Sequence, residues 1–264
     1  AMSAEASDMS GWLLMGLPGV AYWSGLSDAF WTAIGLGIGT YINWLFVAKR
    51  LRRYSAIAGD SITVPDFFSN RFKEDKKVIM TIAGLFILIF FTVYAASCFV
   101  TVGKLFSTLF GIKYQYVMIA GAVFVVFYTI VGGFLAESAS DFMQAIVMIF
   151  VLVFVFIVGT SVAGGVSAVL QNSKEIPGFL ELFGMAQPTL VNGVQQISEA
   201  GKPLFGEPGN YGFLTILSTL SWGLGYFGMP QVLLRFMAIR KSEEITQSRR
   251  IATIWCFISL FAAV

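Results

Sequence analysis

Histidine is absent from this 264-residue sequence, and cysteine occurs only twice. The chain therefore lacks the side chain that most often binds transition metals and acts as a general base. Cys98 and Cys256 each lie in an apolar run, where a buried free thiol is a more frequent role than a disulfide or a metal ligand. The sequence also shows no convincing nucleophile–base set, so we expect neither an enzyme nor a bound cofactor.

Charged residues are scarce as well, at 12% of the chain, and 17 basic residues against 15 acidic ones leave a net charge of +2. This balance gives no basic face, so we expect no nucleic-acid partner. Hydrophobic residues reach 57%, about 150 in all, close to the number that seven spans of about 20 residues use. Such a surface excludes a soluble domain and predicts an all-α membrane protein in a lipid bilayer.

Long apolar runs predict about seven transmembrane helices, at residues 2–23, 30–48, 78–102, 116–135, 141–165, 213–233 and 251–264. Alternating these spans leaves few basic residues on one side of the membrane, namely Lys104, Lys113, Lys174 and Lys202. The positive-inside rule then makes the loop at 49–77 cytoplasmic and the loop at 166–212 extracytoplasmic. Thr63 is placed to cap a short helix in the first loop, and the second favours a short amphipathic helix around 179–183.

The sequence starts at Ala1 and stops within an apolar run. We therefore interpret residues 1–264 as a single transmembrane domain that is incomplete at both ends.

Two spans carry features of interrupted helices. The first contains Gly16 and Pro18, and the sixth contains Gly228 and Pro230. The loop charges give these spans opposite directions, which is the pattern of inverted-topology repeats whose broken helices meet at a midplane site. Glycine and proline are also common in membrane helices that pack closely, so close packing is the alternative.

Asp8 is the most informative single residue, because a carboxylate within a span costs about 2.5–3.5 kcal/mol and usually faces a polar interior. Ser7 and Ser10 flank it, and Gly11 allows the backbone to unwind. Carboxylate, hydroxyl and carbonyl oxygens suit a hard monovalent cation rather than zinc. The alternative is that Asp8 lies near the inner interface.

Asp141 opens the predicted fifth span on the cytoplasmic side. Either it is a helix N-terminal charge favoured by the macrodipole, or it is a station for a cation that leaves inward. Tyr94 lies in the middle of a span, where packing is the more frequent role. Trp222 and Tyr226 lie on a broken segment and share one helical face if the turn is intact.

Several motifs together resemble the sodium/solute symporter family, most closely its bacterial sodium/proline symporters. They are Ala6-Ser7-Asp8-Met9-Ser10-Gly11-Trp12, Thr63-Val64-Pro65-Asp66-Phe67-Phe68 and Trp222-Gly223-Leu224-Gly225-Tyr226-Phe227-Gly228. The resemblance implies a truncated inverted-repeat bundle, similar to a leucine transporter, that holds roughly the second to eighth spans. The sequence departs from the family pattern at Glu5, where the family usually has glycine, and at Glu137, where it usually has an apolar residue. It also departs at Met229 and Gln231 and has a longer outer loop.

On this resemblance, sodium is the coupling ion and no other metal is bound. The resemblance implies sodium-binding roles for Ala6, Asp8, Met9 and Asp141. It implies contacts with the solute for Ser10, Gly11, Trp12, Tyr94, Trp222 and Tyr226, and it gives Pro230 a structural role in the second broken helix.

The function that the resemblance implies is sodium-coupled uptake of a small amino acid, L-proline, across a bacterial plasma membrane by alternating access. Alternatives are symport of another solute, such as pantothenate, a sugar or a carboxylate, or a sensory domain of a signalling receptor. The part of the sodium site on the eighth span would lie beyond Val264, so we expect residues 1–264 alone not to transport.

Overall fold

A computed structural model describes residues 1–199 and 201–264. The chain forms two compact units, and each is described by itself. Unit 1 contains Ala1–Gly11, Ile42–Ile146 and Phe227–Ala252, and unit 2 contains Trp12–Tyr41, Val147–Tyr226 and Thr253–Val264. Two of the points at which the chain passes between units, after Gly11 and after Tyr226, fall within the two segments that the sequence predicts to be broken.

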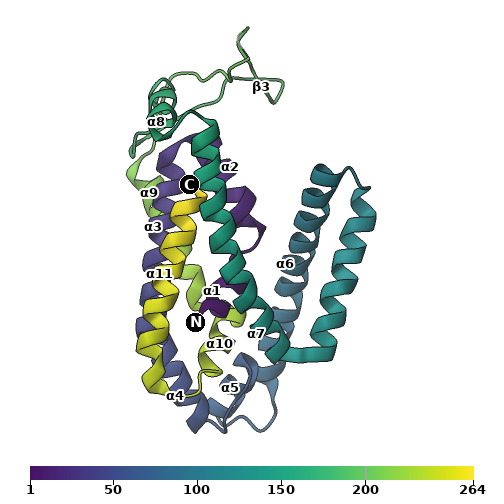
Figure 1. The fold of residues 1–264 in the computed structure, drawn as a ribbon. Coiled ribbons are helices and arrows are strands. Elements are labelled where there is room, and N and C mark those ends of the chain that lie inside the picture. Colours follow the sequence, from purple (N-terminus) through teal and green to yellow (C-terminus); the bar gives the residue numbers. More distant parts are fainter. Residues whose placement is uncertain (200) are drawn as a thin grey trace. The chain divides into compact units, whose positions relative to one another are not determined.

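The chain is predominantly helical (Figure 1), which confirms the predicted all-α class. The helices are α1 (Met2–Asp8), α2 (Leu17–Ser24), α3 (Leu26–Ile42), α4 (Lys49–Ile57), α5 (Val64–Arg71), α6 (Val78–Phe110), α7 (Tyr114–Val162), α8 (Val166–Lys174), α9 (Phe213–Leu220), α10 (Pro230–Met237) and α11 (Ile245–Ala263). Trp12–Gly16 and Asn43–Ala48 are π-helical, and Ser221–Phe227 and Ser242–Glu244 are 3₁₀-helical.

Among the described residues, three helical stretches are long and apolar enough to cross a membrane: Leu26–Ile57, Val78–Phe110 and Tyr114–Val162. A shorter apolar helical stretch covers Phe213–Phe227. The last of the long stretches contains two of the predicted spans, one on each side of Gly133.

Gly133 divides α7, because its φ of 56° and ψ of −152° are not helical. This conformation is rarely adopted by residues with a Cβ, so the kink depends on glycine. The sequence interpretation expected a loop before a helix starting at Asp141, and that was wrong. The polar residues from Glu137 to Ser140 continue the helix, and Asp141 lies two turns after the kink rather than at a helix N-terminus.

Much of the loop predicted at 49–77 is helical. α4 extends the second span to Ile57, and α5 begins at Val64. The Thr63 side chain accepts a hydrogen bond from the backbone N–H of Asp66 at 3.3 Å, which is the predicted N-cap.

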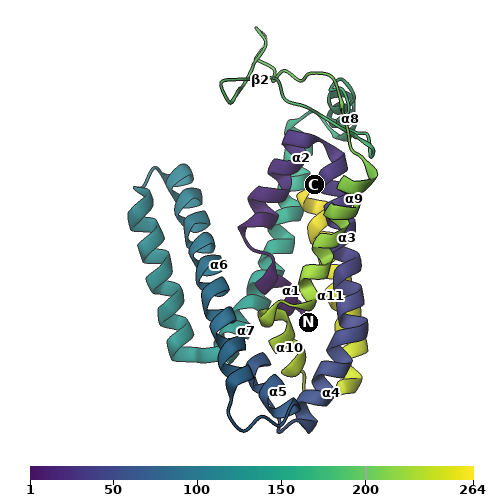
Figure 2. The same ribbon diagram turned by 180° about the vertical axis from the view of Figure 1, so that it is seen from behind.

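The described residues of 166–212 begin with α8 and continue with the short strands β1 (Gly184–Met185), β2 (Leu190–Val191), β3 (Val194–Gln195) and β4 (Gly209–Asn210). β1 pairs with β4 and β2 with β3, both antiparallel; Figure 2 shows β2 and α8 in this part of unit 2. The short helix predicted around 179–183 is not formed. The carbonyl of Phe179 instead accepts from the Leu26 N–H at 2.7 Å, so this segment is bound to the start of α3.

Tyr211 binds this loop to helices of unit 2 through its side chain. Its buried hydroxyl donates to Asp28 Oδ1 at 3.0 Å and shares a hydrogen bond of 2.7 Å with Thr219 Oγ1. We expect Tyr211→Phe to increase the rate of proteolysis within 166–212 about tenfold, because it keeps the ring and removes a hydrogen bond to a charged group worth about 1.5–3 kcal/mol. Tyr22→Phe, which removes an exposed hydroxyl contact to Gln195, is the control. Equal rates for both variants would contradict this role.

The hydrogen bonds of the Tyr211 hydroxyl should persist over a wide pH range. Burial is the main cause that raises the pKa of Tyr211; the hydrogen bond with Thr219 opposes it, and the hydrogen bond to Asp28 and the Asp28 charge raise the pKa further. The proton on the hydroxyl is therefore retained below the ordinary tyrosine pKa of about 10 and lost only as pH rises through the higher folded-state value. We expect the proteolysis rate of the loop, corrected for protease activity, to stay constant between about pH 6 and about pH 9.

Candidate ion and solute site

The first helix break lies at Met9 and Ser10, directly after α1. The Ser10 N–H donates to the carbonyl of Asp8 at 2.9 Å. In a continuous α-helix that N–H would donate to Ala6, so the Ala6 carbonyl loses its usual helical donor. The break is earlier than the predicted Gly16 and Pro18, where the chain stays helical and changes from the π-helical turn to α2. A proline is tolerated there because it occupies the first turn of α2.

Asp8 lies beside a small group of polar side chains in unit 1. Gln231 Nε2 donates to Asp8 Oδ1 at 3.4 Å. Tyr94 on α6 lies close enough to Asp8 and to the Ser10 side chain to interact with both. Gln231 Oε1 is buried and has no hydrogen-bond partner within the part of the chain that is described. These contacts bring together the predicted residues Asp8, Ser10 and Tyr94, and they add Gln231.

The second break separates α9 from α10. Ser221–Phe227 is 3₁₀-helical, Met229 is extended with a ψ of 108°, and α10 begins at Pro230. Gly228 and Pro230 therefore flank a non-helical residue, at the position the sequence indicated.

The narrower 3₁₀ turn changes which side chains share a face. Residues three apart eclipse each other in a 3₁₀ helix, so residues four apart are rotated by a third of a turn. Trp222 is 51% exposed and Tyr226 only 8% exposed. The prediction that Trp222 and Tyr226 share one face applied only to an intact α-helical turn. Because this segment is 3₁₀-helical, the two side chains do not share a face.

Trp12 and Trp222 are in contact within unit 2. Their ring centroids are 4.8 Å apart with an interplanar angle of 57°. Trp12 follows the first break and Trp222 precedes the second, so one aromatic pair joins the two interrupted spans. Tilted aromatic pairs at this distance provide an apolar surface with electron-rich faces.

Asp141 is paired with Arg235 on α10. Arg235 Nη2 donates to Asp141 Oδ2 at 2.5 Å, and Ser3 Oγ donates to the same oxygen at 3.0 Å. Sequence reasoning missed this partner, because Arg235 lies just outside the predicted sixth span at 213–233, where a loop was expected. Its 7% exposure shows that it is an interior residue of unit 1. Its position within an otherwise apolar turn, Val232-Leu233-Leu234-Arg235-Phe236, was the available signal.

Glu5, the charge that the sequence left unexplained, also has a partner in unit 1. Its buried carboxylate accepts a hydrogen bond of 2.9 Å from Trp44 Nε1. The Trp44 ring packs on Phe236 with centroids 4.5 Å apart. The contact holds α1 against a buried cluster from α10, α11 and the π-helical turn Asn43–Ala48.

The predicted site residues thus fall into two groups. Ala6, Asp8, Met9, Ser10, Gly11, Tyr94 and Asp141 belong to unit 1, and Trp12, Trp222 and Tyr226 belong to unit 2.

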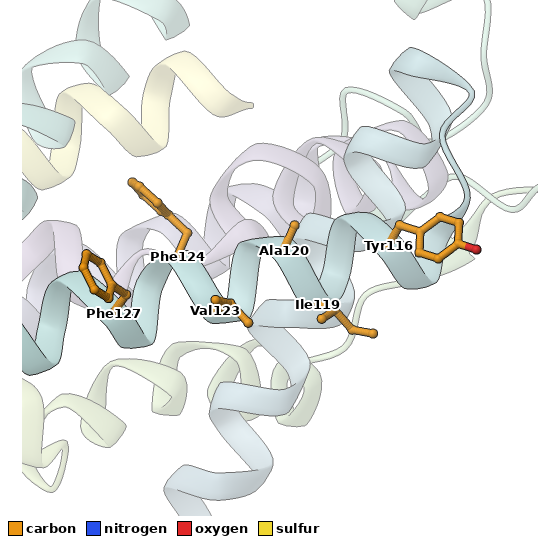
Figure 3. Close-up of a pocket in the computed structure, with 6 residues that line it drawn as sticks. All are labelled: Tyr116, Ile119, Ala120, Val123, Phe124 and Phe127. Carbon is orange, nitrogen blue, oxygen red and sulfur yellow. The ribbon is translucent and has the colours of Figure 1, made fainter.

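A separate hollow lies on α7, away from all of these residues in sequence. It is lined by Tyr116, Ile119, Ala120, Val123, Phe124 and Phe127 (Figure 3). Their spacing of three and four residues places them on one helix face, and the lining is almost entirely apolar. It offers hydrocarbon contact and no polar chemistry for an ion.

Comparison with known proteins matches the sequence pattern of the sodium:solute symporter family to residues 1–264. Proteins named sodium/proline symporter from Staphylococcus aureus strains USA300 and NCTC 8325 / PS 47 are each 42% identical over 264 residues. The match covers 100% of this chain and 46% of each relative, so the chain spans about half the length of these relatives. No solved structure matches the chain. Because the match extends over the whole sequence, the chain belongs to the sodium:solute symporter family.

Proposed function

We propose that the protein containing this chain is a sodium-coupled symporter for L-proline in a bacterial plasma membrane. It works by alternating access, with sodium as the coupling ion, no cofactor, no nucleic-acid partner and no enzymatic activity. The names of the relatives support the cargo, and the family and the long apolar helices support a multi-pass membrane protein. The observation that carries the proposal is the interruption after Asp8, which frees the Ala6 carbonyl next to a carboxylate.

In this proposal sodium is held by oxygen atoms around the first break. The carbonyls of Ala6 and Met9 provide ligands, and Asp8 is the electrostatic anchor. Asp141 lies on the route by which sodium leaves toward the cytoplasm. A carbonyl that loses its helical donor is costly in hydrocarbon, by several kcal/mol, so an ion bound at the Ala6 carbonyl stabilises the broken helix.

In this proposal each interrupted segment provides groups that suit the solute. Backbone N–H groups at a half-helix N-terminus suit the proline carboxylate. Aromatic faces suit its apolar ring and its ammonium group. The residues proposed for these contacts are Ser10, Gly11, Trp12, Tyr94, Trp222 and Tyr226.

Joint binding of ion and solute couples their movements. Sodium entry provides about 2.3 kcal/mol per charge for each 100 mV of membrane potential. If sodium stabilises the conformation that binds proline, proline must increase the affinity for sodium by the same factor.

Uptake of labelled proline by the full-length protein in proteoliposomes tests the proposal. We expect uptake to require an inward sodium gradient and to fail when potassium replaces sodium. Unlabelled proline should abolish the signal, whereas pantothenate, sugars and carboxylates should leave it unchanged. Sodium-dependent uptake of one of those competitors in place of proline would overturn the cargo, and uptake without sodium would overturn the coupling.

A further inference from the structure

Arg235 forms the most extensive polar contact set in the described part of unit 1. Nε donates to Ser3 Oγ at 2.8 Å and Nη1 to the Gln231 carbonyl at 2.8 Å. Nη2 donates to Asp141 Oδ2 at 2.5 Å and lies 3.7 Å from Glu137 Oε1. A buried guanidinium requires a counter-charge and satisfied donors, and this one has both.

Two carboxylates therefore face one guanidinium. Glu137 and Asp141 are four residues apart on α7, so they lie on the same helix face. The Asp141 side chain is 14% exposed and makes the short contact, whereas the Glu137 side chain is 43% exposed and makes the longer one. Arg235 thus contacts the more buried Asp141 at a short distance and has the more exposed Glu137 within reach.

The Arg235 contacts connect parts of both interrupted spans. Ser3 belongs to α1, which precedes the first break, and Gln231 and Arg235 belong to α10, which follows the second. Gln231 links this network to Asp8, because its carbonyl accepts from Arg235 while its side chain donates to Asp8. With Ser3 donating to Asp141, the network fastens α1 and α10 to α7 after its kink.

A cation and the guanidinium compete for Asp141. Both are positive, so a cation that arrives at Asp141 repels the guanidinium that contacts Oδ2 and weakens that contact. Withdrawal without a new partner would leave an uncompensated buried charge, which is strongly unfavourable. Glu137, one turn away, removes that cost because it keeps a carboxylate on the guanidinium throughout.

We propose that Arg235 acts as a latch that changes its carboxylate partner. The latch is closed when Arg235 pairs with Asp141, as in this structure, and it opens when sodium reaches Asp141 and Arg235 pairs with Glu137 instead. Arg235 and Glu137 are positioning residues in this step, since neither contacts the solute. The proposal rests on the proposed sodium route through Asp141. No bond or proton is transferred; one ion pair replaces another.

Glu137→Gln in the full-length protein tests the exchange, because glutamine keeps the size and removes the outer counter-charge. Opening is read by N-ethylmaleimide labelling of Ser138→Cys in a background without the native cysteines. Ser138 Oγ is buried, so a thiol there should react only when the latch opens. We expect Glu137→Gln to slow labelling about tenfold and to lower turnover by a similar factor, or about 1.4 kcal/mol in the barrier. The KM for proline should stay within about twofold.

Two further variants separate the latch from a general effect of lost charge. Glu244→Gln breaks the exposed Arg240–Glu244 pair of 2.7 Å in the same unit and should leave labelling and turnover unchanged. Arg235→Lys keeps the positive charge but lacks the planar guanidinium that contacts Ser3, Gln231 and Asp141 at the same time. Because the pair with Asp141 is then weaker, this variant should be labelled faster. Unchanged labelling in Glu137→Gln, or slowed labelling with normal turnover, would overturn the proposal. Labelling needs no solute, so it still decides the latch if proline proves not to be the cargo.

Discussion

We expect Gly223→Ala to lower the free energy of unfolding of the full-length protein by about 3 kcal/mol or more, and Gly225→Ala to change it by less than about 1 kcal/mol. The two glycines lie on the same 3₁₀-helical segment, yet only one faces a neighbouring backbone in unit 2. A Cβ on Gly223 would lie 2.0 Å from the Gly35 carbonyl oxygen, whereas a Cβ on Gly225 would meet no atom within 4 Å.

The reason for the large effect is that backbone atoms cannot move aside as a flexible side chain does. Gly39 on α3 makes the reciprocal approach, with a Cβ there lying 2.4 Å from the Gly223 carbonyl oxygen. Overpacking of this kind forces backbone shifts and separates α3 from the segment that carries Trp222. Gly39→Ala should therefore be as damaging as Gly223→Ala.

Thermal unfolding of purified full-length variants in detergent, followed by loss of the monodisperse peak in size-exclusion chromatography, measures this difference. Gly225→Ala is the matched control, since it makes the same chemical change two residues away. Similar unfolding midpoints for Gly223→Ala and Gly225→Ala would show that the close approach of α3 is not required.

The sequence allowed prediction of the apolar spans and of the general location of both interruptions. Long runs and the scarcity of charge are properties of single segments, so they need no knowledge of partners. Gly228 and Pro230 mark the second break because proline cannot donate a backbone hydrogen bond and fits the first turn of α10. At the first break the glycine and proline signal was misleading, because the hydrogen bond that matters joins the Ser10 N–H to Asp8.

Contacts between distant segments were not predictable. Arg235 follows directly on an apolar stretch and precedes a basic loop, so its sequence position fits a loop charge equally well. Its burial depends on Asp141 and Ser3, which lie 94 and 232 residues away. Glu5 is similar, since only folding brings Trp44 Nε1 to its carboxylate. A single sequence shows that a charge is unusual, and it does not show which group neutralises it.

We expect Asp8→Asn to weaken the sodium dependence of uptake by the full-length protein about 100-fold, which corresponds to about 2.7 kcal/mol. Asparagine has nearly the same shape and still accepts a hydrogen bond from Gln231, so the change removes charge and little else. A unit charge about 4 Å from an ion contributes about 4 kcal/mol at an effective dielectric constant of about 20, which accommodates this loss. Membrane insertion should not suffer, because the variant removes a carboxylate that costs about 2.5–3.5 kcal/mol within a span.

The measurement is the sodium concentration that gives half-maximal proline uptake, together with the amount of protein in the membrane from an immunoblot. Asp66→Asn is the control: it makes the same change in unit 1, at a carboxylate on α5 that accepts a hydrogen bond from Asn70 at 3.2 Å. It should leave the sodium dependence unchanged. Raised proline KM with normal sodium dependence in Asp8→Asn would place Asp8 at the solute instead of the ion. A normal sodium dependence together with a normal proline KM would show that Asp8 is not part of the site, because a carboxylate that anchors the ion cannot lose its charge without an effect on sodium binding.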